Sequence, residues 1–167
     1  MIAEIGHFAL ILALVLSVVQ CVLPLVGAAR GIGSWMALAR TAAYANALFL
    51  TISFGTLAYS FYISDFTLLN VASNSNSLLP WFYKVAASWG SHEGSILFWA
   101  LMLTWWGFLV ALTSRKLPQE TVARVLGVMG FITAGFVAFM LFTSNPFLRL
   151  FPAAPEGADL NPLLQGP

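Results

Sequence analysis

The chain has 167 residues, of which 60% are hydrophobic and 8% are charged, and its net charge is +1. A soluble domain is typically about 25% charged, so this composition excludes an ordinary cytosolic enzyme and indicates an integral membrane protein. The chain has no surplus of Lys and Arg to neutralise a phosphate backbone, so we expect no nucleic-acid partner.

Four stretches of the chain are apolar over the roughly 20 residues that a membrane-spanning helix needs. They lie at about residues 8–29, 41–63, 94–113 and 125–145. Each is expected to be helical, because a lone strand would leave its backbone polar groups unpaired in lipid. Pro24 is expected to kink the first span or to mark its end. The predicted fold class is therefore all-α integral membrane, with four transmembrane helices surrounded by membrane lipid.

The connections between the spans differ in positive charge. Those on one side carry five basic residues, namely Arg30, Arg40, Arg115, Lys116 and Arg124. The other side carries Lys84 and Arg149. Lys and Arg concentrate in cytoplasmic loops, so the side with five is predicted to be cytoplasmic. Both termini, the long loop at 64–93 and the tail at 146–167 are then predicted to lie outside.

The outer loop divides into two parts. A Ser/Asn cluster at 73–77 is expected to form a turn, because these side chains bond to nearby backbone. Pro80 suits the first turn of a short amphipathic helix at the membrane–water boundary. Trp81, Val85, Ser88, Trp89 and His92 recur at three- and four-residue spacing and are predicted to share one face of it. The aromatic residues fit either an interfacial belt or a surface that binds a ligand.

His92 and Glu93 stand between two glycines and leave several hypotheses open. They are either an exposed polar pair in a turn, or a site that ligates, moves protons or bonds to a partner carboxylate. His7 is predicted to lie on the same side, so a metal or haem site that uses both histidines is a further hypothesis. We identify no catalytic motif and assign no catalytic or metal-binding residue.

Two features inside the spans predict helix packing. Asn46 is the only strongly polar side chain well inside the second span, and we expect it to form an interhelical hydrogen bond. Gly130 and Ala134 have the small-xxx-small spacing that lets another helix approach closely.

Several segments together resemble the cytochrome c maturation haem lyase family of the CcmF/NrfE type. The clearest is Trp-Gly-Ser-His-Glu-Gly-Ser at 89–95. The others, in chain order, are residues 4–8, 65–67, 71–76, 79–80, 123–126, 141–147 and 159–165. The resemblance covers nearly the whole chain.

The resemblance implies a role in c-type cytochrome biogenesis at the bacterial inner membrane. Proteins of this family receive haem from a periplasmic haem chaperone and help attach it to apocytochrome c, which thiol-handling maturation subunits present. Family members are several times longer, and their tryptophan-rich haem-handling segment and membrane-haem histidines lie downstream. The chain at 1–167 thus resembles an N-terminal transmembrane module that packs against the remaining C-terminal portion and is not catalytic alone.

The cofactor implied is haem, bound mainly by the downstream portion. Trp81, Trp89, His92 and Glu93 are our candidates for lining a haem or partner surface, since aromatic faces stack on a flat porphyrin. The alternative hypothesis is a free-standing membrane scaffold or small carrier without haem chemistry.

Overall fold

The computed structural model describes residues 1–158, so the similarity at 159–165 lies outside the described residues. The described chain forms α1 (Ile2–Arg30), α2 (Gly33–Tyr62), α3 (Leu69–Asn74), α4 (Trp81–Gly90), α5 (His92–Thr113), the 3-10 turn η1 (Ser114–Lys116) and α6 (Gln119–Phe142). Within it, α1, α2, α5 with η1, and α6 are long and apolar enough to cross a membrane. The predicted all-α fold with four such helices is confirmed.

The long helices begin before the apolar stretches that predicted them. The first begins at Ile2 and the second at Gly33, because polar turns outside a bilayer keep their main-chain hydrogen bonds as well as apolar turns do. Pro24 does not end α1, which continues through it to Arg30. Pro24 is buried against neighbouring helices, an environment in which membrane helices tolerate proline. The helix ends where Gly31 adopts a left-handed conformation with φ 69°.

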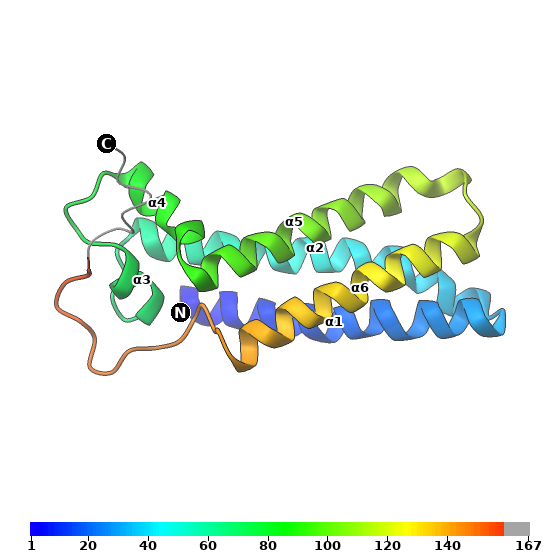
Figure 1. Ribbon diagram of the computed structural model, residues 1–167, viewed down its shortest axis with the longest axis horizontal. Coiled ribbons are helices and arrows are strands. Elements are labelled where there is room, and N and C mark those ends of the chain that lie inside the picture. Colours follow the sequence, from blue (N-terminus) through cyan, green and yellow to red (C-terminus); the bar gives the residue numbers. More distant parts are fainter. Residues whose placement is uncertain (159–167) are drawn as a thin grey trace.

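The four long helices run side by side along the long axis of the molecule (Figure 1). The first helix packs against both α2 and α6, and α5 packs chiefly against α2. One end of the bundle, here called the loop end, carries α3, α4, the N-terminus and residues 143–158 (Figure 1). The opposite end, here called the turn end, holds the short connections at 31–32 and 114–118.

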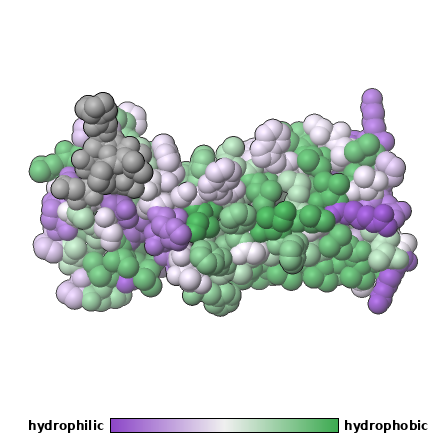
Figure 2. All heavy atoms as spheres, in the orientation of Figure 1, coloured by the Kyte–Doolittle hydropathy of each residue, from purple (hydrophilic) through white to green (hydrophobic). Residues whose placement is uncertain are grey.

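Hydropathy divides the surface in the same way. The middle of the bundle is apolar, and hydrophilic side chains project from the turn end (Figure 2). Arg30, Arg115 and Lys116 are exposed there. This distribution is typical of a protein with a hydrocarbon belt and a basic end.

A polar network joins three helices in the bundle interior. Asn46 Nδ2 donates to Gln20 Oε1 at 2.7 Å, and Ser17 Oγ donates to Asn46 Oδ1 at 3.3 Å. Gln20 Nε2 donates to the carbonyl of Leu126 on α6 at 2.8 Å. The predicted interhelical hydrogen bond of Asn46 is therefore confirmed.

The close helix approach predicted at Gly130 is also confirmed. A Cβ atom added there would lie 3.0 Å from both the main-chain nitrogen of Cys21 and the Cβ of Gln20. Glycine is thus what lets α6 lie directly against α1 at this level.

The structure confirms part of one prediction for the long loop and corrects another. The Ser/Asn cluster forms a turn at its end, where the N–H of Leu78 donates to Asn76 Oδ1 at 3.1 Å, but Ser73 and Asn74 belong to helix α3. The short helix α4 is present, but Ser91 is extended and separates it from α5. His92 therefore begins α5 and does not share the face of Trp81 and Trp89.

Candidate functional site

The two histidines both contact the segment that follows α6 at the loop end. Asn145 Nδ2 lies 3.4 Å from His7 Nδ1, and Ser144 Oγ lies 3.4 Å from His92 Nε2. Asn145 is itself oriented by the main-chain N–H of Phe147, which donates to its Oδ1 at 2.9 Å. Adjacent residues of one segment thus connect the start of α1 with the start of α5.

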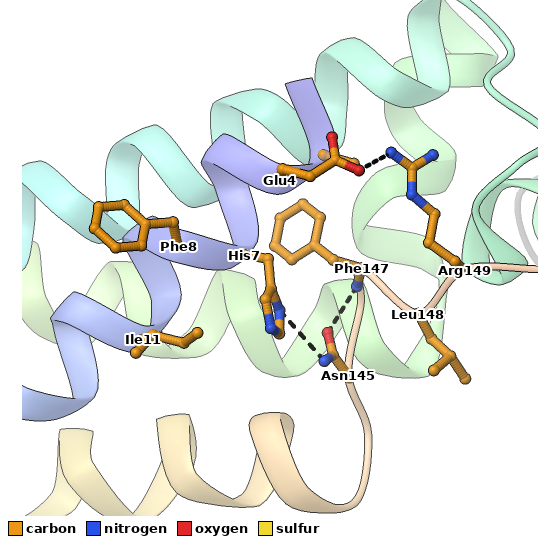
Figure 3. A pocket seen from close by; sticks show the side chains of 9 residues that line it. Glu4, His7, Phe8, Ile11, Asn145, Phe147, Leu148 and Arg149 are labelled. Carbon is orange, nitrogen blue, oxygen red and sulfur yellow. Dashed lines mark hydrogen bonds and ion pairs between the residues drawn. The ribbon is translucent and has the colours of Figure 1, made fainter. Parts of the chain in front are cut away.

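His7 lines a pocket of about 350 Å³ beside the first turns of α1 (Figure 3). Its lining residues are Ala3, Glu4, His7, Phe8, Ile11, Asn145, Phe147, Leu148 and Arg149. Arg149 points toward Glu4 across this pocket and forms an ion pair with it (Figure 3). Arg149 also donates to Thr67 Oγ1, and its Nη1 lies 3.9 Å from Asp65 Oδ2. Because two carboxylates face the guanidinium, the pocket has no surplus positive charge to attract an anion.

Arg149 belongs to a set of contacts between residues 148–150 and the start of the long loop that the sequence did not predict. The N–H of Leu69 donates to the carbonyl of Leu148 at 2.9 Å, and the N–H of Leu150 donates to that of Thr67 at 2.8 Å. These bonds hold residues 148–150 against the start of the long loop. The available signal was that Glu4, Asp65 and Arg149 fall on one predicted side of the membrane with opposite charges.

The tail is tied to the loop at a second point. Ser77 donates to Glu156 through both its main-chain N–H, at 2.9 Å, and its hydroxyl, at 2.6 Å. The Ser77 hydroxyl bond is the main reason why the pKa of Glu156 lies below its ordinary value.

Glu93 lines a second pocket, of about 210 Å³, at the loop end. We call it the Glu93 pocket, and its lining residues are Leu69, Asn70, Ser73, Asn74, Glu93, Thr143, Ser144, Asn145 and Leu148. Ser91 caps α5 by accepting the N–H of Gly94 at 3.1 Å, and this fixes the first helical turn that carries Glu93. The sequence pattern did not predict that Asn70 and Ser144 would join Glu93.

The four candidate residues do not all line one pocket. His92 and Glu93 adjoin the segment at 143–145, whereas Trp81 and Trp89 do not line the Glu93 pocket. Trp81 is 65% exposed and Trp89 is 44% exposed on α4. The Trp89 ring centroid lies 6.3 Å from that of Phe98 on α5.

These features define the class of the protein, which is that of a polytopic helical membrane protein with a polar loop end. Residues 89–167 match a family model described as "Cytochrome C assembly protein".

Proteins that are similar to this chain over nearly its whole length identify the family more specifically. The chain is 57% identical over 99% of its length to the cytochrome c-type biogenesis protein CcmF of Pseudomonas aeruginosa. It is 49% identical to CcmF of Escherichia coli over 100% of its length, and 46% identical to NrfE of Haemophilus influenzae over 99%. A solved cytochrome c haem lyase CcmF matches 88% of the chain with a TM-score of 0.81 and 27% identity.

The chain is homologous to the N-terminal quarter of the CcmF, NrfE and CycK cytochrome c-type biogenesis proteins. It covers 25% of the P. aeruginosa protein, 26% of the E. coli protein and 25% of the solved haem lyase chain. The family resemblance seen in the sequence is confirmed.

The described residues do not fit a haem held by axial ligands within the bilayer, which usually needs them on the spanning helices. Both histidines of the sequence lie at the loop end, in contact with residues 144 and 145. An apolar groove of about 400 Å³ between α5 and α6 has neither histidine nor cysteine in its lining. Residues 1–158 also contain no group of three His, Cys, Asp or Glu side chains arranged for a metal ion. We therefore assign no chemical step to haem on these residues.

Proposed function

We propose that this chain is the N-terminal module of a membrane haem lyase in periplasmic c-type cytochrome biogenesis. Its role is to help build the platform where haem is attached to apocytochrome c, with haem bound mainly by the C-terminal portion. The observation that carries this proposal is the 57% identity that extends over 99% of the chain but 25% of the relative.

The exposed aromatic face between α5 and α6 supports the role of a platform. Its groove is lined by Phe98, Trp99, Met102, Leu103, Trp106, Ile132 and Phe136. Trp99 and Trp106 are 66% and 60% exposed. We propose that helices from the remaining three quarters of the haem lyase cover this face, because large aromatic side chains bury extensive contact area at interfaces.

The loop end is the proposed contact surface for haem or for partner proteins. Trp81 and Trp89 offer exposed rings for stacking. His92 and Glu93 lie beside the segment at 143–145 and supply polar groups. The proposed partners are the periplasmic haem chaperone, apocytochrome c and the thiol-handling subunits, with the loop end in the periplasm and the turn end in the cytoplasm of a bacterial inner membrane.

Complementation tests the proposed module directly. A strain lacking the haem lyase is supplied with the C-terminal portion of the P. aeruginosa relative, with or without this chain, and covalent cytochrome c is measured by haem staining. We expect cytochrome c only when both parts are present. Cytochrome c made by this chain alone would contradict the proposal, as would stoichiometric haem bound to the purified chain.

Trp89→Ala tests the loop-end surface in the same strain. We expect it to lower the cytochrome c yield several-fold while leaving the amount of inserted protein unchanged. The matched control is Leu78→Ala, which removes another exposed apolar side chain of the same loop. Equal losses of yield and of inserted protein would instead assign Trp89 to an interfacial belt.

A further inference from the structure

The Glu93 pocket brings together three segments that are far apart in the sequence. Leu69, Asn70, Ser73 and Asn74 come from α3, Glu93 comes from the first turn of α5, and residues 143–145 and 148 come from the segment after α6. Most of the lining side chains carry neutral hydrogen-bonding groups. Glu93 is the only charged residue in the lining.

The carboxylate of Glu93 is half-buried and has no counter-ion. Within residues 1–158 it forms no hydrogen bond and no ion pair. It stands in the first turn of α5, near the N–H groups of the helix N-terminus. The pocket therefore contains an acidic side chain that pairs with no cation among the described residues.

Asn70, which also lines the Glu93 pocket, has a polar side-chain atom without a partner in residues 1–158. Asn70 is 5% exposed, and its Oδ1 accepts a hydrogen bond from Asn74 Nδ2 at 3.1 Å. This bond identifies Oδ1 as the accepting atom of the amide, so the group left over is the donor Nδ2, which has no partner among the described residues. Buried polar groups in folded proteins nearly always find a partner, so an unsatisfied donor at a pocket points to an acceptor supplied from outside.

We propose that the Glu93 pocket binds a lysine or arginine side chain presented by a polypeptide segment. The cationic group pairs with the Glu93 carboxylate, and a main-chain carbonyl of the same segment accepts from the Asn70 amide. Asn70 Nδ2 is buried, so binding includes a small turn of this side chain toward the occupant.

Charge and size favour this occupant over an anionic cofactor. A haem propionate or a phosphate would meet the Glu93 carboxylate with no cation in the lining to compensate. The pocket volume of about 210 Å³ is also smaller than the roughly 300 Å³ at which small-molecule sites begin, and it suits a single side chain.

Peptide binding to the full chain in lipid nanodiscs tests the proposal without haem. The probes are an acetylated, amidated Gly-Ser-Lys-Ser-Gly peptide and the same peptide with norleucine in place of lysine. Binding is followed by NMR line broadening against empty nanodiscs. We expect the lysine peptide to bind about tenfold more tightly, which corresponds to about 1.4 kcal/mol.

Matched variants locate the effect at the pocket. Glu93→Gln is expected to abolish the preference for lysine, and Glu93→Asp is expected to retain it. Glu120→Gln removes the same charge at the turn end, where Glu120 pairs with Arg124, and is expected to leave the preference unchanged. Equal binding of the two peptides, no binding of either, or a preference that survives Glu93→Gln would overturn the proposal.

A final arm identifies the source of the cation. The titration is repeated after the C-terminal portion of the haem lyase has been co-assembled with the chain. Loss of peptide binding would show that the C-terminal portion supplies the cation, and retained binding would show that a separate polypeptide supplies it. Since the peptide assay contains no haem and scores no cytochrome, its failure leaves the proposed module intact.

Discussion

Two seams of the helix bundle are built from opposite kinds of residue. The closed seam, at Ser17, Gln20, Asn46 and Gly130, has small side chains and hydrogen bonds that join α1, α2 and α6. The open seam is the groove between α5 and α6, and it is lined by large aromatic and aliphatic side chains that remain exposed. Small residues and polar bonds join the helices at the closed seam. Bulky exposed side chains line the open seam, where further protein is proposed to pack.

The largest expected loss of stability comes from a substitution in the closed seam. Gly130→Leu forces a side chain against the α1 backbone and is expected to destabilise the bundle by about 1–3 kcal/mol. Gly135→Leu is the matched control on the same helix, because no heavy atom lies within 4 Å of its added Cβ. Unfolding in mixed detergent, followed by tryptophan fluorescence, measures both. Equal destabilisation by the two variants would remove the distinction between the seams.

A smaller loss is expected when the polar network is cut. Asn46→Leu leaves Gln20 Oε1 without its donor and is expected to cost about 1 kcal/mol in the same unfolding assay. The control is Thr113→Val, which removes an exposed hydroxyl that bonds only within its own helix. An Asn46→Leu variant as stable as the control would show that the network contributes no net stability.

The open seam is expected to respond only when the rest of the haem lyase is present. Trp99→Ala should change the unfolding of the chain alone by no more than about 0.5 kcal/mol, because the side chain is exposed. It should lower co-purification with the C-terminal portion, whereas Leu48→Ala, an exposed residue on α2, should not. Unchanged co-purification of the Trp99 variant would place the interface elsewhere.

The smallest effect concerns neither seam but the tail at the loop end. The folded pKa of Glu156 is lowered, so its bonds to Ser77 stabilise the tail above the ordinary glutamate pKa and are lost as the pH falls through the folded value. The Ser77 amide should therefore become less protected from hydrogen exchange as the pH is lowered below about 4.3. In a Glu156→Gln variant the protection of this amide should not change over the same pH range. Protection that does not depend on pH would exclude this tie.

The helices and the packing of Asn46 and Gly130 could be predicted because their causes are local. Apolar length determines a spanning helix, and a lone polar or small residue within it has few alternative uses. The prediction that His92 shares a helix face with Trp81 and Trp89 was wrong, because three- and four-residue spacing assumes one continuous helix. Ser91 interrupts the helix by adopting an extended backbone and capping α5.

The membrane class, the four long helices and the family resemblance all follow from the amino-acid sequence, since each depends on composition or on contiguous motifs. Three contacts are visible only in the folded chain: His7 and His92 contact neighbouring residues, Arg149 faces Glu4, and Asn70 shares a pocket with Glu93. These pairs come from segments far apart in the chain. Their proximity depends on how the helices pack and where the tail crosses the loop end, which no local pattern encodes.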